Sequence, residues 1–393
     1  MRLVGVRREL EGHHRYRGQL RRGLGRAPAG RLNRELDSEV AFRSVTAADL
    51  RRFTAEASVA AGVAPAHVPY LVEGLVEATL RGIDAHGVYR LPHYLRGFRE
   101  GFLNAAPRVT TVRSKGAITV LDGDNGLGVV VGQLAMERAA DLASECGIGM
   151  VAVRNSNHSG MLAAHVLVAA RRGMIGHFLS NAPALMAPSG GSRAILSNGP
   201  LAWAVPRASH EPIVLDMACS AAARSKIRLA AREGRRIPKG WAVGDDGEPT
   251  TDPRLALSGA LLPFGGHKGY GLTVINEILS GALPGARLPL EMSTAFLAED
   301  ATTLDSWGAG HLALALEIEA FGERASFDRQ VEALVDSLRS AGRDGNEILP
   351  PGEPESRTRV TRLGAGVPLS ERVLDDLRQL AEELGVPPVD EAA

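Results

Sequence analysis

The sequence predicts an α/β protein with a largely buried sheet and with helical segments at both ends of the chain. Between residues 116 and 324, apolar runs of strand length alternate with alanine-rich stretches of helical length. This alternation is typical of layered α/β structures. The chain has 393 residues, of which 45% are hydrophobic, and this length favours two packed lobes over one.

The first segment of the chain is basic and has no sustained apolar face. Residues 1–35 contain ten arginines and three glutamates, with glycines between them. A signal peptide needs a continuous apolar segment, which this stretch lacks. We therefore expect residues 1–43 to form a disordered basic extension, with an organelle-targeting or nucleic-acid-binding arm as the alternative.

Helices are predicted near both ends of the remaining chain. Thr46 and Asp49 form a capping-box-like start, and a second helix is expected over residues 66–81. Near the other end, helices are expected over 328–339 and over 370–384, where Ser370 is the N-cap and Gly385 the stop. These elements place a helical part at residues 44–115, packed with residues 325–393. Residues 349–354 read as a rigid connector.

The region 116–324 is predicted to be the α/β domain that binds cofactor and substrate. Its expected strands are 117–121, 150–153, 175–179, 213–215 and 312–318. Its expected helices are 133–146, 161–172, 221–233 and 270–280.

The composition excludes several classes of function. Basic and acidic residues number 45 each, and aromatic residues make up 4%, which argues against nucleic-acid binding. No apolar run is long enough to span a membrane. The two cysteines, Cys146 and Cys219, cannot build a disulfide framework, and no group of side chains has metal-ligand spacing. We expect a cytoplasmic enzyme that uses no metal.

The first candidate site follows the predicted helix 66–81. His86 can exchange a proton near neutral pH, as carbonyl reduction requires. Arg90 offers a planar fork that matches a carboxylate with two hydrogen bonds. The competing interpretation is a capping Asp84 with His86 and Arg90 solvated on the surface.

Three further segments carry polar or glycine-rich motifs. Residues 154–160 follow a predicted strand, a position where α/β proteins bind ligands, although an ordinary Asn/Ser turn is the competing interpretation. Residues 215–220 contain Asp216 after another strand. Residues 264–271 hold four glycines and Lys268 at a helix start, which favours phosphate.

A glycine pattern that suggests a dinucleotide-binding loop is an alternative phosphate site. Gly126, Gly128 and Gly132 lie between a predicted strand and a helix. However, four residues (122–125) separate them from the strand, and the acid expected about 20 residues on is replaced by Arg154. An arginine there could serve NADP, so this reading stays open.

Taken together, these segments resemble the malate/L-lactate dehydrogenase family of the second, non-Rossmann type. Its relatives include ureidoglycolate, sulfolactate and diketogulonate dehydrogenases and cyclic imino-acid reductases. The resemblance runs from about Thr46 to about Pro387. The matching pieces are Leu80–Val88, Arg90–Pro92, Asn155–His158, Leu215–Ala218, Gly247–Pro253, Leu262–Gly271 and Pro351–Glu353.

The resemblance implies a fold, a cofactor and a set of site residues. The fold would be a layered α/β domain with a mixed sheet of non-Rossmann type, plus a helical domain formed from both chain ends. His86 would be the catalytic acid/base and Arg90 the carboxylate clamp, with Tyr94, His158 and Asn198 at the substrate. NAD or NADP would contact the following residues: His158, Ser159, Gly160, Asp216, Met217, Ala218, Gly266, His267, Lys268, Gly269, Tyr270 and Gly271. Family members form homodimers with active sites near the interface.

Three departures from the family lie where substrate and nicotinamide would meet. Ala85 stands in place of a serine before the catalytic histidine, Ser159 in place of a phenylalanine, and Asn198-Gly199-Pro200 in place of Thr-Asn-Pro. The expected reaction is the interconversion of a small 2-hydroxy acid and its 2-keto acid with NAD(P). Reduction of a 2-imino acid is the alternative. A cofactor-binding protein with weak or lost catalysis is a further alternative.

Overall fold

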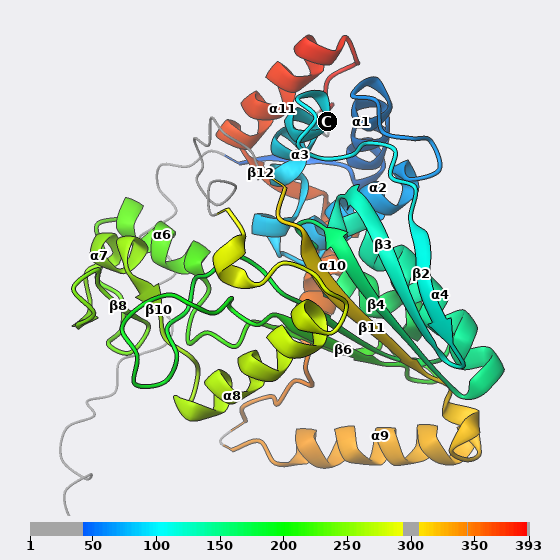
Figure 1. Cartoon of the computed structure of the whole chain (residues 1–393). Helices are drawn as coiled ribbons and strands as arrows, with labels where there is room; N and C mark the ends of the chain where they lie inside the picture. The colour runs from blue at the N-terminus through cyan, green and yellow to red at the C-terminus, as the bar shows by residue number, and fades with distance from the viewer. Residues whose placement is uncertain (1–41, 294–305, 344, 391–393) are drawn as a thin grey trace, which may run out of the picture. The chain divides into compact units, whose positions relative to one another are not determined.

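A seven-stranded mixed sheet forms the centre of the protein (Figure 1). The computed structural model describes residues 42–293, 306–343 and 345–390. The strand order is β2-β3-β4-β11-β5-β6-β7, and only β3 and β4 pair in parallel. The strands are β2 (Thr110–Lys115), β3 (Ile118–Gly126), β4 (Ile148–Ser156), β5 (Ile175–Ser180), β6 (Leu201–Val205), β7 (Ile213–Met217) and β11 (Ala309–Leu316). The predicted mixed α/β fold is confirmed.

Helices cover both faces of this sheet. The helices α4 (Gly128–Cys146) and α5 (Ala163–Arg171) pack on one face, where their alanines allow close approach to the strands. On the other face lies α8 (His267–Asn276), which continues as a π-helical turn, Glu277–Ala282. A smaller sheet of β8 (Ala242–Val243), β9 (Pro249–Thr250) and β10 (Ala260–Leu261) lies beside α6 (Arg224–Arg232) and α7 (Pro253–Ser258).

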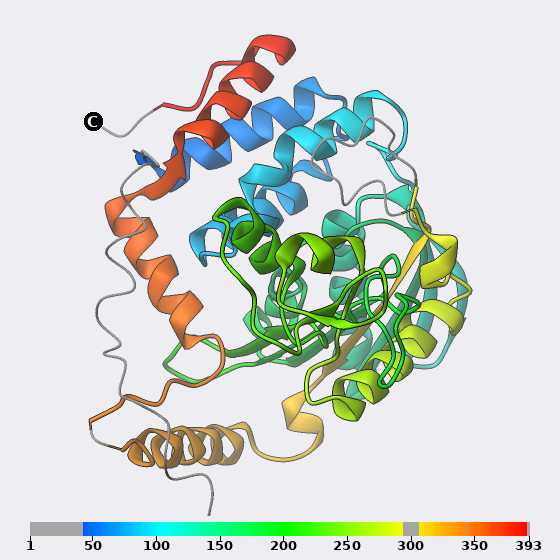
Figure 2. The same cartoon turned by 90° about the vertical axis from the view of Figure 1, so that its left-hand side faces the viewer.

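Both ends of the unit Phe42–Ala393 contribute to one helical layer. The layer contains α1 (Ala47–Ala60), α2 (Val68–Leu80), α3 (Leu91–Arg99), α10 (Glu353–Ala365) and α11 (Glu371–Leu384). Strand β1 (Phe42–Val45) pairs antiparallel with β12 (Val367–Ser370), and α11 lies beside α1 (Figure 2). The predicted N-caps Thr46 and Ser370 both accept a backbone N–H, and Gly385 ends α11 in the left-handed conformation.

Several elements differ from those expected from sequence. Strand β6 and helix α3 were not predicted, and α4 begins at Gly128 rather than at residue 133. Strand β2 belongs to the central sheet although it falls before residue 116; all its side chains are exposed, so no apolar run marks it. Helix α10 follows directly from the expected connector because Pro354 is tolerated in the first helical turn. Phe42 and Arg43 pair in β1, whereas the rest of the expected basic extension, residues 1–41, lies outside the described residues.

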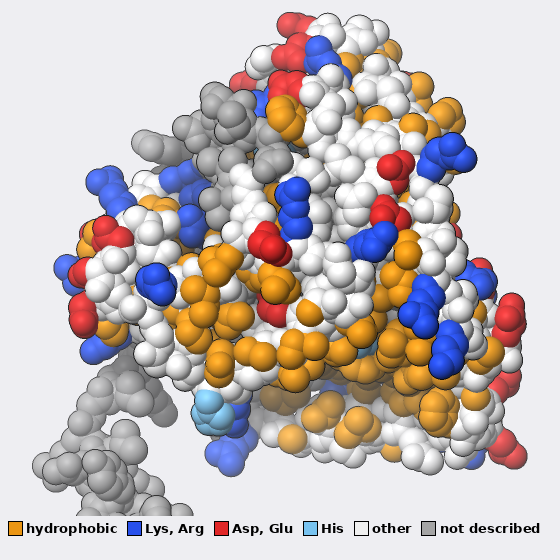
Figure 3. Space-filling view, viewed as in Figure 1, with side chains coloured by type: hydrophobic (Ala, Val, Ile, Leu, Met, Phe, Trp, Pro, Cys, Tyr) orange, Lys and Arg blue, Asp and Glu red, His pale blue; other side chains and the backbone are white. Residues whose placement is uncertain are grey.

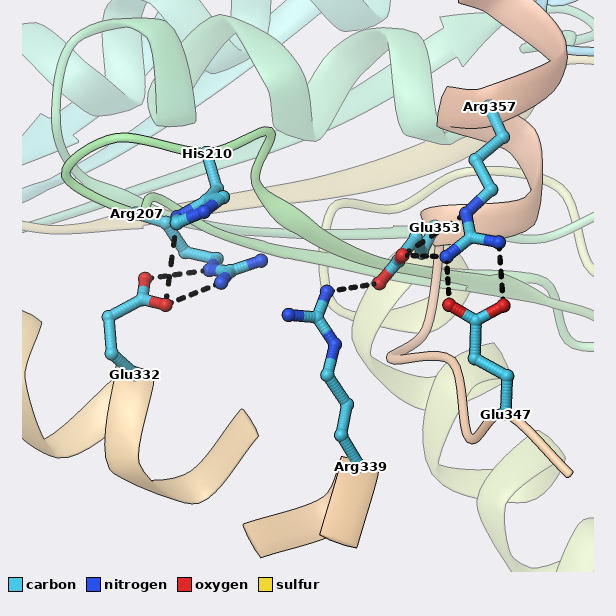
Figure 4. Close-up of polar contacts among 7 residues, drawn as sticks. All are labelled: Arg207, His210, Glu332, Arg339, Glu347, Glu353 and Arg357. Atoms are coloured by element: carbon cyan, nitrogen blue, oxygen red, sulfur yellow. Dashed lines mark hydrogen bonds and ion pairs between the residues drawn. The ribbon is translucent and has the colours of Figure 1, made fainter. Parts of the chain in front are cut away.

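Helix α9 (Arg324–Ser340) lies apart from the helical layer and is fastened largely by ion pairs. Only Val335 of this helix is fully buried. Arg207 and His210, from the loop after β6, both pair with Glu332 of α9 (Figure 4). Arg339, near the end of α9, pairs with Glu353, the first residue of α10, which Arg357 also binds. We call these six ion-paired residues, together with Glu347, the α9 ion-pair cluster.

No helix within the described ranges is both long and apolar enough to cross a membrane.

Candidate active site

A cavity of about 610 Å³ lies where the central sheet meets the helical layer. Its walls come from residues that are far apart in the chain, including the turn after α2, the loop between β4 and α5, and the end of β7. The described lining residues that the sequence had singled out are His86, Arg90, His158, Ser159, Gly160, Asn198, Asp216, Met217 and Ala218. The fold therefore gathers three of the four candidate segments, together with Asn198, into one site.

His86 and His158 stack against each other in this cavity. Their ring centroids are 5.6 Å apart and their planes differ by 17°. The hydroxyl of Tyr94 shares a hydrogen bond of 2.6 Å with Nδ1 of His158. Trp307 meets the His158 ring edge-on at 5.4 Å. Tyr94 is fully buried behind His158 and is not among the lining residues, so the structure places it as a support for His158 rather than in the pocket wall expected from sequence.

The His86 imidazole is held in its neutral form. Burial lowers its pKa to about 4, and the nearby Arg90 guanidinium lowers it further by charge repulsion. Its Nδ1 has no hydrogen-bond partner among the described residues, and its neighbour Ala85 supplies no hydroxyl. Such a side chain is a proton acceptor at neutral pH and a strong acid once protonated.

Arg90 reaches the same cavity from the start of α3. Its Nε donates to the carbonyl of Ala85 at 3.1 Å, which directs the guanidinium along the His86 turn. The guanidinium carbon also lies 5.8 Å from the centroid of the Tyr89 ring. A carboxylate that approaches this fork would lie beside His86.

The loop from His158 to α5 forms a second wall. Asp216, at the end of β7, accepts a hydrogen bond of 2.7 Å from the backbone N–H of Ala163, the first residue of α5. A carboxylate at a helix N-terminus is favourable because it satisfies free N–H groups and the positive end of the helix dipole. This hydrogen bond connects the end of β7 to the start of α5, directly after the loop that contains Ser159 and Gly160.

Several lining residues were missed by sequence reasoning. They are Arg81, Asn181, Arg224, Trp307 and the stretch Leu349–Gly352 with Pro354 and Glu355. Arg81 pairs with the buried Glu77, and Asn181 exchanges hydrogen bonds with Gly310. The stretch Pro351–Glu353 had matched a family motif but was interpreted as a connector. Its glycine, Gly352, adopts φ +83°, and this glycine was the sequence feature that could have marked the stretch as part of the site.

The glycine-rich segment 266–271 lies outside this cavity. None of Gly266, His267, Lys268, Gly269, Tyr270 and Gly271 is a lining residue. Gly269 is buried, and a Cβ there would lie 2.6 Å from the carbonyl oxygen of Cys219 and 2.7 Å from that of Phe264. This glycine is therefore required for close backbone packing, and its link to phosphate binding remains a prediction.

The alternative glycine pattern is also a packing feature. A Cβ on Gly128 would lie 2.3 Å from the carbonyl oxygen of Asn157, and one on Gly132 would contact the ring of His165 at 2.7 Å. Neither residue lines the cavity. These glycines let α4 approach β4 and α5.

The cavity suits a nicotinamide dinucleotide together with a small acid. Its volume lies within the range of roughly 300–1,000 Å³ that is usual for ligand and cofactor sites. Backbone groups of the β4–α5 loop, Asn181 and Asn198 supply neutral polar contacts, and Arg81, Arg90 and Arg224 supply positive charge for anionic groups. The residues present therefore fit such a group.

Comparison with known proteins agrees with the fold. A family model described as malate/L-lactate dehydrogenase matches residues 45–378. The chain is 39% identical over 312 residues to the L-sulfolactate dehydrogenase of Methanocaldococcus jannaschii, covering 79% of this chain and 88% of that protein. It is 37% identical over 326 residues to the malate dehydrogenase of Pyrococcus abyssi, covering 80% and 88%.

Further similarities extend to a solved structure and to an imine reductase. The structure of the sulfolactate dehydrogenase of M. jannaschii superposes with a TM-score of 0.81 at 35% identity, over 87% of this chain and 98% of that one. A Δ1-pyrroline-2-carboxylate/Δ1-piperideine-2-carboxylate reductase of Pseudomonas putida is 33% identical over 323 residues, 81% of this chain and 91% of that protein.

The layered sheet, the cavity beside it and the relatives define a non-Rossmann oxidoreductase of 2-substituted acids. The chain belongs to the malate/L-lactate dehydrogenase family. It is an NAD(P)-dependent dehydrogenase or reductase of that family, with NAD or NADP as its cofactor.

Proposed function

We propose that this protein interconverts a small 2-hydroxy acid, of the malate or lactate type, and its 2-keto acid in the cytoplasm. The observation that carries the proposal is the juxtaposition of His86 and Arg90 in the cavity. A proton-transfer group and a carboxylate fork side by side match a substrate that has an oxygen next to its carboxylate.

Arg90 binds the substrate carboxylate in this proposal. Its fork can donate two parallel hydrogen bonds to the carboxylate. The negative charge of the carboxylate also offsets the repulsion between Arg90 and a protonated His86. Substrate binding therefore favours protonation of His86. Asn198, on the same cavity, would donate to the substrate oxygens.

His86 transfers the proton. In the reductive direction it gives its proton to the carbonyl oxygen, and in the oxidative direction it removes the proton of the hydroxyl. A bound NAD(P) would supply the hydride in the reductive direction and accept it in the oxidative direction. His158–Gly160 and Asp216–Ala218 would hold the cofactor, and Trp307 with the stacked His158 would exclude water from the reacting carbon.

The test is a substrate panel with matched variants. NAD(P)H consumption is measured with keto acids and with imines formed from amine and keto acid, at matched concentrations. We expect turnover with a keto acid, a loss of about 10²–10⁴ in rate for His86→Ala, and a raised KM for Arg90→Lys because lysine cannot form the bidentate contact. Cofactor affinity should change by no more than a few-fold in either variant.

Other results would point elsewhere. Turnover with the imines alone would favour a 2-imino acid reductase, the activity in the name of the P. putida relative. Cofactor binding without any turnover would favour a binding protein. The motive for this alternative is that Nδ1 of His86, beside Ala85, has no hydrogen-bond partner within the described part of the chain. Wild-type rates in His86→Ala would remove His86 from the mechanism.

We also propose that the protein is a homodimer, with a second copy packed on α8. The exposed apolar residues on α8 and its continuation are Leu272, Ile275, Ile278 and Leu283. Figure 3 shows hydrophobic side chains gathered in a band over α8 and the neighbouring strands. We call these four residues the α8 apolar strip. Contiguous apolar surface of this kind is typical of protein interfaces. The segment Gly266–Gly271, at the start of the same helix, would then lie near the interface.

A further inference from the structure

The π-helical turn Glu277–Ala282 lies directly behind the cavity-lining asparagines. It continues α8 without a break, so that one extra residue is accommodated per turn. Single π turns within α-helices are rare and are frequently found at functional sites. The contacts of this turn show what it supports.

Two consecutive side chains at the start of the turn hold one segment of the cavity wall. Glu277, only 6% exposed, accepts at Oε1 from the hydroxyl and the backbone N–H of Ser197. The Ser197 hydroxyl in turn accepts from the N–H of Gly199 at 3.0 Å. Asn276 donates from Nδ2 to the carbonyl of Pro200 at 2.9 Å. Both ends of the segment that contains Asn198 are thus fastened to the turn.

The same turn also backs the second cavity asparagine. A Cβ on Gly281 would lie 2.8 Å from Nδ2 of Asn181. That Nδ2 donates to the carbonyl of Arg287 at 2.8 Å, while Asn181 Oδ1 accepts from Gly310. The turn therefore packs closely against both Asn181 and the Asn198 segment.

Burial of the Glu277 carboxyl group lowers the stability of the fold. Its Oε2 has no hydrogen-bond partner among the described residues. Burial raises its pKa to about 7, because the charged form is poorly solvated there. A buried polar atom without a partner lowers stability, so its retention needs a reason. The hydrogen bonds that Glu277 accepts from Ser197 provide this reason.

We infer that Glu277 is a positioning residue, which sets Asn198 in the substrate pocket through Ser197 and Gly199. This inference rests on the proposed function only where it assigns Asn198 to the substrate. Glu277 itself does not line the cavity and touches no reacting group. Its effect is expected on substrate binding more than on cofactor binding or the proton transfer.

The test compares Glu277→Gln with Glu277→Leu. The glutamine amide keeps an oxygen that can accept both hydrogen bonds from Ser197, whereas leucine keeps only the bulk. We expect Glu277→Leu to raise KM for the keto acid at least about ten-fold, with KM for NAD(P)H and kcat within about three-fold of wild type. Glu277→Gln should restore KM to within about three-fold. Adding Glu277→Leu to Asn198→Ala should raise KM no further than Asn198→Ala alone, because both substitutions remove the same contact, the one between Asn198 and the substrate.

Hydrogen exchange provides a readout that needs no turnover. In Glu277→Leu the backbone amides of residues 197–199 should exchange at least about ten-fold faster than in wild type. The control is Gln133→Leu, which removes a side chain that is also buried and hydrogen-bonded but lies off the cavity. It should lower stability and leave both KM and the exchange of residues 197–199 unchanged.

Three results would overturn the inference. They are unchanged exchange of residues 197–199 in Glu277→Leu, equal KM effects in Glu277→Leu and Gln133→Leu, and additive effects of Glu277→Leu and Asn198→Ala on KM. A wild-type protein that turns over neither keto acids nor imines would instead refute the proposed function. The exchange experiment would still decide whether Glu277 positions the segment.

Discussion

The His86–Arg90 pair makes the pH dependence of the two reaction directions differ. Reduction needs protonated His86, and with a pKa of about 4 the protonated fraction falls about ten-fold for each pH unit above it. We expect kcat/KM for keto-acid reduction to fall about ten-fold per unit from pH 6 to pH 8. Oxidation needs the neutral imidazole, which is fully populated over this range, so its profile should be flat with respect to His86.

Steady-state profiles in both directions check this prediction. A reduction profile that is level between pH 6 and pH 7 would mean that His86 titrates near neutrality in the working enzyme. That outcome would contradict the low pKa that burial and Arg90 impose in the free cavity.

Substitution of Gly269 and substitution of Gly128 are expected to lower the stability of the fold in the same way. Valine at either position would push its side chain into backbone atoms, at Cys219 and Phe264 for Gly269 and at Asn157 for Gly128. We expect Gly269→Val and Gly128→Val each to destabilise the fold by several kcal/mol, as over-packing in a core does. Thermal melting measures this directly.

Gly271 is the better probe of the expected phosphate contact. A Cβ there meets no atom within 4 Å, so Gly271→Ala should melt like wild type. A weaker NAD(P)H affinity in Gly271→Ala would support contact between the glycine-rich segment and the cofactor. Unchanged affinity would leave residues 266–271 with a structural role alone.

The Glu353 contacts connect α9 to one wall of the cavity. Glu353 follows Gly352, which lines the cavity, and it binds Arg339 of α9 and Arg357 of α10. We expect Glu353→Gln to raise the Kd for NAD(P)H about two- to five-fold, because the Pro350–Gly352 turn loses its charged anchor. Glu347→Gln, which removes the other partner of Arg357 away from the cavity, is the matched control.

Fluorescence titration of NADH and NADPH measures the effect. High salt should weaken binding in wild type in the same direction, because exposed ion pairs are screened. Equal Kd values in Glu353→Gln and wild type would show that the α9 ion-pair cluster serves only to hold α9.

Sequence reasoning succeeded for elements with a periodic apolar pattern and for motifs with distinctive chemistry. Helices α1 and α11 were predicted with their caps, and strands β3, β4, β5, β7 and β11 within a few residues. His86, His158 and Asp216 were singled out, and the fold brings all three to one cavity. Local patterns are sufficient for such residues because their chemistry is visible in one segment.

It failed where structure depends on partners far away in the chain. Strand β2 has no apolar face, and β12 is recognisable only through its pairing with β1. Arg81, Asn181 and Trp307 look ordinary in sequence, and only the fold turns them toward the cavity. At Gly269 the sequence indicated only a phosphate contact, which remains a prediction, because the tight packing of this glycine against Cys219 and Phe264 is invisible in the local pattern.

The α8 apolar strip predicts the behaviour of the whole molecule in solution. If a second copy covers the strip, Ile275→Asp should convert a dimer to a monomer, because a charge would be buried at the interface. Leu255→Asp, at a similarly exposed residue on α7, is the control and should leave the mass unchanged. Analytical ultracentrifugation at several concentrations measures both. A wild-type monomer at micromolar concentration would contradict the homodimer.

The pairing of β1 with β12 has a consequence for synthesis on the ribosome. About 320 residues separate Val45 from its partner Val367. At roughly 5–20 residues per second, the N-terminal helices wait roughly 15–60 s for their partner strand and for α11. During that interval the apolar face of α1, with Leu50 and Phe53, has no C-terminal layer to cover it. The nascent chain is therefore a natural client for chaperones, and slowing translation should increase its aggregation.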